Sequence, residues 1–152
     1  MRGQASFRNN SASMTSASKP LLTSNELRKL ATHEPGHCTC ALKICRGWES
    51  VGDDRWPAEQ MMSAGTLRAE LPEGQLELSF EEFHPEGTRY DSPDAPIALA
   101  YFPYNRCDVY ACKTCQCAVL KYTEYGGYYV DHRVRLVDAG NVIDRTIIDP
   151  LT

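Results

Sequence analysis

Seven cysteines are the residues of this 152-residue chain that are best able to do chemistry. Four lie within eleven positions and three lie far upstream: Cys107, Cys112, Cys115 and Cys117, and then Cys38, Cys40 and Cys45. No apolar run resembles a secretory signal, so we expect a reducing, cytoplasmic location in which stable disulfides are rare. An odd number of thiols would also leave one outside any disulfide framework. The cysteines therefore favour a metal site.

The spacing Cys112-x2-Cys115 is similar to the knuckle of a zinc ribbon, in which a tight turn between two strands points both thiolates at one ion. Structural Zn²⁺ takes four ligands in a tetrahedron, so a second pair is needed. We predict Cys38 and Cys40, because alternate residues of a strand share a face and a bridge between distant segments would stabilise a small core. Cys45 is left out of the site. Three other side chains could replace the second pair: Cys107, Cys117 and His37.

Two other thiol sites compete with zinc. Cys107-x4-Cys112-x2-Cys115 has the spacing of plant-type [2Fe–2S] proteins, but no cysteine follows Cys117 to supply a distant fourth ligand. A thioredoxin-like pair needs its first cysteine at the start of a helix, whereas the residues after this pair have the pattern of a strand. One departure from a ribbon is Gln116, where ribbons often turn on glycine. A structural zinc ion stays the favoured interpretation.

Catalytic motifs are scarce. The residues His33 to His37 satisfy the H-E-x-x-H pattern of zinc proteases, but Pro35 would interrupt the helix that this chemistry requires. The sequence has no nucleophile elbow, P-loop or dinucleotide-binding motif. We therefore expect a protein that is not an enzyme. The alternative is a thiol-redox or metal-dependent enzyme that uses Cys112, Cys115 and His132.

The charge of the chain is uneven. Its net charge is −4, yet residues 53–96 hold eleven acidic residues against three arginines. Such a block would repel phosphate backbones and attract a basic protein surface, although a solvated face is the simpler explanation. No window approaches the ~20 apolar residues that cross a bilayer. We expect a protein partner, and neither nucleic acid nor a membrane.

The elements predict an α+β domain over residues 21–152, after a disordered tail over residues 1–20. Thr23 and Glu26 form a capping box that starts a helix, and Pro57 starts a second helix through residue 71. Strands are expected at residues 75–83 and 97–104, and two more flank Gly126-Gly127. Tyrosines 122, 125, 128 and 129 gather at that turn. The expected architecture is short N-terminal helices and a small antiparallel sheet that carries a zinc-knuckle-like hairpin.

Residues 83–138 resemble a group of small, uncharacterised bacterial proteins linked to toxin–immunity loci. The residues that carry the resemblance are the segment from Pro96 to Asn105, the cysteines 107, 112 and 115, and the run LKYTEYGGYYVDHR. The resemblance implies a cytoplasmic, zinc-stabilised protein-binding module. Its implied role is that of an immunity protein that neutralises a basic toxin domain.

Overall fold

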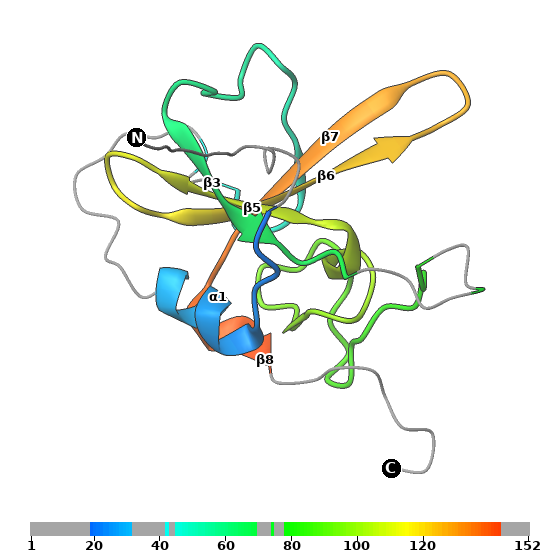
Figure 1. Ribbon diagram of the computed structural model, residues 1–152. Helices are drawn as coiled ribbons and strands as arrows, with labels where there is room; N and C mark the ends of the chain where they lie inside the picture. Colours follow the sequence, from blue (N-terminus) through cyan, green and yellow to red (C-terminus); the bar gives the residue numbers. More distant parts are fainter. Residues whose placement is uncertain (1–18, 32–41, 43–44, 70–73, 75–77, 144–152) are drawn as a thin grey trace, which may run out of the picture.

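The structure is a computed structural model that describes residues 19–31, 42, 45–69, 74 and 78–143 (Figure 1). It has one α-helix and a five-stranded antiparallel sheet, which confirms the α+β class. The described part begins at Lys19, whose ammonium group lies 2.8 Å from Asp108 Oδ2. Pro20 O accepts a hydrogen bond from Thr66 N at 2.9 Å, so the end of the predicted tail is held against the sheet. None of the described helices is long and apolar enough to cross a membrane.

The helix α1 spans Ser24–Ala31 and starts at the predicted capping box. Thr23 Oγ1 accepts a hydrogen bond from Glu26 N at 3.1 Å, and Glu26 Oε1 accepts one from Thr23 N at 2.9 Å. These two bonds satisfy backbone donors that a helix start leaves open. Leu27 is fully buried, so α1 packs one apolar face on the sheet. The predicted helix stop at Pro35-Gly36 lies outside the described residues.

The sheet has the strand order β2-β7-β6-β5-β3, and all its neighbours are antiparallel. In chain order its strands are β2 (Glu49–Ser50), β3 (Met61–Thr66), β5 (Asp108–Cys112), β6 (Ala118–Tyr125) and β7 (Val130–Leu136). The predicted hairpin about Gly126-Gly127 is confirmed, because β6 and β7 pair from Val119↔Leu136 to Tyr125↔Val130. A second, parallel pair joins two short strands: β4 (Ile97–Ala98) and β8 (Val142–Ile143). The described residues also include the 3-10 helices η3 (Tyr104–Arg106) and η4 (Ala139–Asn141).

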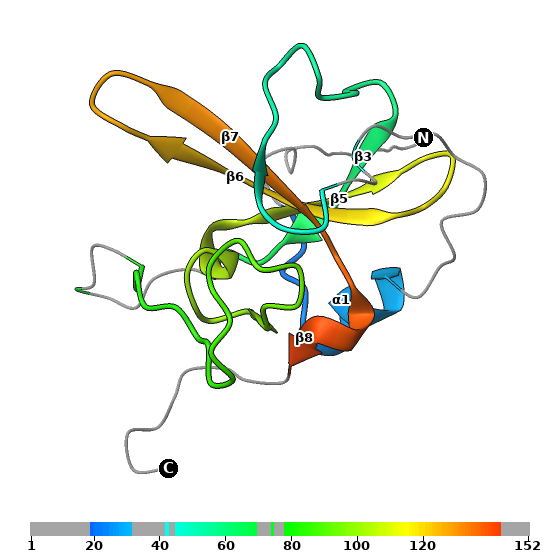
Figure 2. The same cartoon turned by 180° about the vertical axis from the view of Figure 1, so that it is seen from behind.

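Each side of the sheet carries its own core. On one side, which we call the helix face, α1 and the β4–β8 pair cover the strands (Figure 2). Its buried residues are Leu27, Trp48, Leu67, Ile97, Tyr104, Cys107, Val109, Ala118, Leu120, Tyr122, Val137 and Val142. The other side, which we call the sulfur face, packs against Leu42, Cys45, Val51 and Trp56. Its buried residues are Leu42, Cys45, Val51, Met61, Cys112, Cys115, Cys117, Val119 and Val134.

The predicted second helix is wrong. Residues 61–66 form the strand β3, which pairs with β5 from Met61↔Cys112 to Thr66↔Asp108. Gly65 has a φ of +149°, which an α-helix does not contain, and it sits at a register shift of the ladder. A Cβ at this glycine would lie 2.7 Å from Pro20 O, so the close approach of the N-terminal segment also requires glycine. Pairing with β5 overrides the local helical signal.

Two predicted strands are mostly loop. Over residues 78–83, the described part of the predicted strand 75–83, there is no strand, and Asn105 and Arg106 donate hydrogen bonds to the carbonyls of Leu78 and Ser79. The predicted strand 97–104 continues as strand only through Ala98. Pro103 has no N–H for a ladder, and this apolar segment instead folds under the sheet with Tyr104 buried.

Candidate functional site

The two cysteines of the predicted knuckle lie at the turn between β5 and β6. Cys112 ends β5, and Cys115 follows within the turn; their side chains are 1% and 6% exposed. The turn is closed by a hydrogen bond from Gln116 N to Cys112 O at 2.8 Å, and by one from Cys112 N to Cys117 O at 3.0 Å. Gln116 takes a φ of +63°, in the region that favours glycine. A tight hairpin turn is therefore present, with a non-glycine residue in its left-handed position.

Four cysteine thiols belong to the core of the sulfur face. Besides Cys112 and Cys115, this core contains Cys117 and the fully buried Cys45. Cys45 O accepts a hydrogen bond from Leu136 N at 2.7 Å, which holds this residue beside β7. The spacing of the cysteines did not assign Cys45 to the site. The signal that was missed is the apolar residue Leu42 nearby in sequence, which packs with Cys45 in the same core as Cys112 and Cys115.

Cys107 is separated from this group by the sheet itself. It precedes β5 and lies in the core of the helix face, where its thiol donates a hydrogen bond to Pro103 O at 3.2 Å. Complete burial raises the pKa of the Cys107 thiol well above its ordinary value. An odd spacing of five residues from Cys112 puts the two on opposite faces of one strand. Cys107 is therefore a structural thiol, and it does not join a shared site with Cys112.

The other predicted ligands, Cys38, Cys40 and His37, lie outside the described residues, as does the HEPGH motif. Among the residues that are described, no group of three or more Cys, His, Asp or Glu side chains is placed to hold a metal ion. At the turn between β5 and β6, the described residues therefore bring together the two thiols of Cys112 and Cys115 without a third or fourth potential ligand.

The tip of the β6–β7 hairpin is the second candidate site. The hairpin projects away from the rest of the molecule, beyond the end of β5 (Figure 1). Its large side chains face solvent: Tyr125 is 78%, Tyr128 103%, Tyr129 57% and Val130 57% exposed. Packing across the strands would bury such tyrosines, but of tyrosines 122, 125, 128 and 129 only Tyr122 is buried. The tip is an exposed aromatic surface.

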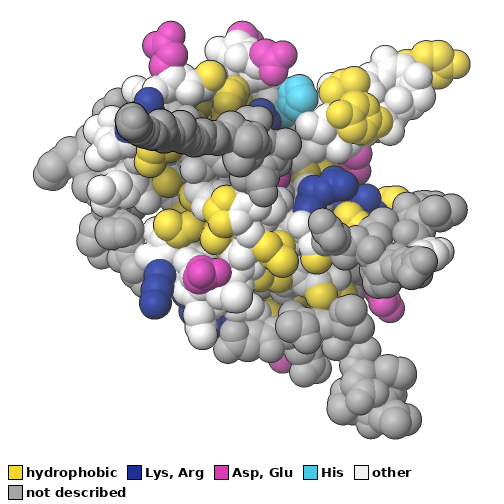
Figure 3. Space-filling model, viewed as in Figure 1, with side chains coloured by type: hydrophobic (Ala, Val, Ile, Leu, Met, Phe, Trp, Pro, Cys, Tyr) yellow, Lys and Arg dark blue, Asp and Glu magenta, His cyan; other side chains and the backbone are white. Residues whose placement is uncertain are grey.

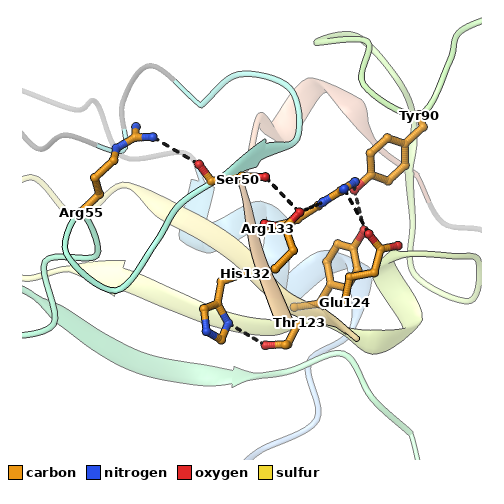
Figure 4. Close-up of polar contacts among 9 residues, drawn as sticks. Ser50, Arg55, Tyr90, Thr123, Glu124, His132 and Arg133 are labelled. Carbon is orange, nitrogen blue, oxygen red and sulfur yellow. Dashed lines mark hydrogen bonds and ion pairs between the residues drawn. The ribbon is translucent and has the colours of Figure 1, made fainter. Parts of the chain in front are cut away.

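A polar network holds the base of this hairpin (Figure 4). Arg133 donates hydrogen bonds to Asp131 Oδ2 at 2.8 Å and to Tyr90 OH at 3.1 Å, and it forms an ion pair with Glu124 at 3.2 Å. Tyr90 OH is hydrogen-bonded in turn to Tyr122 OH. The Arg133 contact lowers the pKa of the Asp131 carboxyl, whereas burial raises the pKa of both tyrosines. The network fixes the hairpin to the loop that contains Tyr90.

His132 lies on the opposite side of β7 from Arg133, as the alternation predicts (Figure 4). Its Nδ1 is 2.9 Å from Thr123 Oγ1, and its Nε2 is 3.6 Å from Asp53 Oδ1. The order Thr–His–Asp is that of a hydrolase triad, but the Asp53 side chain is 91% exposed and its contact is too long for a hydrogen bond. Water screens such a charge. The arrangement therefore orients the Thr123 hydroxyl, and it lacks the features that activate a nucleophile.

Sequence reasoning also missed a buried arginine. Arg135 is fully buried, and it donates hydrogen bonds to Pro93 O and Ala95 O, both at 2.9 Å, and to Tyr104 OH. Within the described part of the chain, these acceptors are neutral. Alternation along β7 puts Arg135 on one face with Asp131 and Arg133, and a face of charged side chains is ordinarily exposed. The loop of residues 90–105 instead folds over that face, and nothing local in the sequence indicates it.

The fold divides the acidic block of residues 53–96. Asp53, Asp54 and Glu59 lie in the segment before β3, which covers the sulfur face. Glu81, Glu82 and Asp91 lie in the loop that packs on the helix face through Tyr90. The acids are thus not gathered on one surface in the described part of the chain.

No family model, curated protein or solved structure matches this chain.

Proposed function

We propose that this protein is a non-enzymatic, cytoplasmic protein-binding module whose contact surface is the tip of the β6–β7 hairpin. The observation that carries the proposal is the exposure of Tyr125, Tyr128, Tyr129 and Val130 on an element that projects from the body. Tyrosine offers a large apolar ring and a polar hydroxyl at low entropic cost, and it is enriched among the residues that dominate interface energies. Burial of such a tip by a partner would remove apolar surface from water.

The base of the hairpin supports this role. Arg133 contacts Asp131, Glu124 and Tyr90, and these contacts fix the orientation of the β6–β7 hairpin in the absence of a partner. A surface that is ordered in advance loses less conformational entropy on binding. The hairpin therefore presents its rings from a fixed base.

The partner that we propose is a basic domain, such as that of a toxin that this protein neutralises. Asp53 and Asp54 are exposed beside the hairpin, since Asp53 is the residue that approaches His132. A partner with an apolar cleft and a rim of lysine or arginine would match the aromatic tip and these carboxylates. Because the other described acidic residues of residues 53–96 lie in the loop on the helix face, only the acidic side chains of the segment before β3 would contact this partner.

We further propose that a structural Zn²⁺ ion, bound by Cys38, Cys40, Cys112 and Cys115, stabilises the sulfur face. Two of these thiols are buried together at the knuckle. Leu42, the described residue nearest in sequence to Cys38 and Cys40, is fully buried in the same core, and the two peptide units that join it to Cys40 span at most about 7 Å. The ion would supply no reactive chemistry. A thioredoxin-like activity is disfavoured because Cys112 ends a strand and does not start a helix.

Calorimetric titration with the protein encoded by the adjacent gene tests the binding function. The double variant Tyr125→Ser/Tyr128→Ser should weaken binding at least tenfold, because both rings lie at the tip. Met62→Ser is the matched control, since Met62 is 52% exposed on β3, away from the hairpin. Equal binding by the double variant and the wild type would refute the assignment of the tip. Absence of binding by the wild type would remove the support for an immunity role.

Elemental analysis of freshly purified protein tests the zinc site. One zinc per colourless chain is expected, and Cys112→Ala or Cys115→Ala should abolish it. Cys107→Ala is the control, because this thiol lies in the other core and should leave the metal content unchanged. Iron with visible absorption bands, or metal-free protein, would contradict the proposal.

A further inference from the structure

A groove lies beside the hairpin on the same side of the sheet as the sulfur face. Its volume is about 350 Å³, within the range of small-ligand sites. The residues that line it and face this side include Asp108 and Tyr110 of β5, and Lys121, Thr123 and Tyr125 of β6. Where β5 and β6 pair, Asp108 lies opposite Lys121, so the groove runs along β6 toward the tip. From Lys121 to Tyr125 the strand rises about 13 Å.

The groove is basic, in contrast to the chain as a whole. Arg68, Arg106 and Lys121 line it, against the single carboxylate of Asp108. That carboxylate is already paired with Lys19 at 2.8 Å. Figure 3 shows Lys and Arg side chains in the hollow beneath the projecting hairpin. The groove therefore has an excess of positive side chains, although the net charge of the whole chain is −4.

The cations are held in place by aromatic rings. Lys121 Nζ lies 4.2 Å from the centre of the Trp56 ring, and the Arg106 guanidinium lies 4.1 Å from that of Phe80. Partial burial lowers the pKa of Lys121, so its charge is desolvated and would gain from an anionic neighbour. Arg68 is exposed at the rim. Guanidinium forks and an ammonium point charge are the groups that proteins use for phosphate.

Two further features define the ligand. The Thr123 hydroxyl is oriented by His132 at 2.9 Å and lines the groove, so it offers a polar contact beside the cations. The Tyr125 ring forms the end of the groove nearest the tip, and it is 78% exposed. An exposed ring further along the same groove from a cationic centre suits a planar group attached to an anion.

The geometry points to a binding site for a small phosphomonoester that carries an aromatic ring, of the nucleoside monophosphate class, with its phosphate at Arg68 and Lys121 and its ring on Tyr125. The limited volume and the acidic remainder of the chain favour a small anion over a long polyanion. This site does not depend on the protein-binding function of the tip.

Calorimetric titration of the full chain with adenosine 5′-monophosphate, adenosine and inorganic phosphate tests the site. The monophosphate should bind at one site per chain, at least tenfold more tightly than either fragment. Raising the salt concentration from 50 to 500 mM should weaken it severalfold. Equal affinity for adenosine and the monophosphate, or no binding, would overturn the assignment. Tighter binding of a ten-residue oligothymidylate would also overturn it, because an open nucleic-acid surface would then explain the charge.

Three variants assign the residues. Arg68→Gln and Lys121→Gln should each weaken binding of the monophosphate at least fivefold, and Tyr125→Leu should reduce its advantage over inorganic phosphate. Lys29→Gln, which removes the same charge from the exposed surface of α1, should bind as the wild type does. Arg68 is exposed, so its variant should fold normally. Unchanged affinity in both groove variants would refute the site. Tyr128→Ser should weaken binding of the partner protein and leave binding of the monophosphate unchanged. This difference separates the two proposals.

Discussion

The two faces of the sheet are built from different materials. The helix face packs Trp48 against three tyrosine rings, with ring centres 5.0 Å away for Tyr122, 5.8 Å for Tyr104 and 6.1 Å for Tyr90. The sulfur face contains four cysteines, one methionine and aliphatic residues, and its tryptophan, Trp56, lies at the edge against Tyr110 at 5.1 Å. Aromatic rings bury much more apolar surface per residue than thiols do.

This difference explains why a metal would matter on one face alone. The helix face combines large rings with the hydrogen bonds of Arg135, which tie the loop of residues 90–105 to β7. The buried part of the sulfur face consists of thiols, one methionine and aliphatic side chains, so its packing gains more from an added crosslink. The two tryptophans of the chain lie one on each face, and fluorescence can therefore follow the faces separately.

The largest expected effect is the loss of the buried arginine. Arg135→Ala should lower the free energy of unfolding by about 3 kcal/mol, because it leaves buried acceptors without a donor and opens a cavity. Arg133→Ala, on the same strand but partly exposed, should cost about 1 kcal/mol. Urea denaturation measures both. A cost for Arg135→Ala no larger than that of Arg133→Ala would show that the helix face does not depend on this residue.

Metal removal should come next. If zinc is present at a hundredfold excess over its Kd, a strong chelator should lower the free energy of unfolding by about 2.7 kcal/mol. Two single-tryptophan variants report on the two faces after the chelator is added. The emission of Trp56, measured in Trp48→Phe, should change at a lower urea concentration than the emission of Trp48, measured in Trp56→Phe. Simultaneous changes at both tryptophans would show that the two faces unfold as one unit.

High pH should act on the helix face. Burial raises the pKa values of Tyr90, Tyr104 and Tyr122 above the ordinary value near 10. The stability that these phenols contribute is complete below about pH 10, where the unfolded phenols are also neutral, and it is lost as the pH rises further. Tyr122→Phe should cost about 1 kcal/mol at pH 8 and should flatten the decline between pH 9 and 11. Tyr128→Phe, at an exposed ring, should leave the decline unchanged.

The smallest expected effect is a gain at the knuckle. Gln116→Gly should stabilise the protein by about 0.5 kcal/mol, because the φ of +63° strains a residue with a side chain. Lys113→Gly in the same turn should destabilise it, since this residue does not require a positive φ. Thermal denaturation compares the two variants. A loss of stability in Gln116→Gly would show that the Gln116 side chain contributes to the turn.

Local signals predicted the helix and the hairpin well. The reciprocal bonds of Thr23 and Glu26 involve neighbours in sequence, and the alternation about Gly126-Gly127 needs only its own two strands. Non-local pairing was not predictable in this way. The segment at Met61 is a strand because it pairs with the edge of β5. The described residues around Phe80 have the pattern of a strand but pair with no strand, and the carbonyls of Leu78 and Ser79 accept hydrogen bonds from side chains instead.

The sequence by itself determined the α+β class, the start of α1, the β6–β7 hairpin and the placement of Cys112 and Cys115 at a turn between two strands. Each follows from residues within one turn or one ribbon, where spacing alone sets the geometry. The tertiary structure decided which face each of the five described cysteines joined, where Arg135 was buried, and that cations from separate segments meet in one groove. These outcomes depend on which distant segments cover the sheet. The free energy that selects those segments comes from contacts between residues far apart in sequence, so no local pattern reports it.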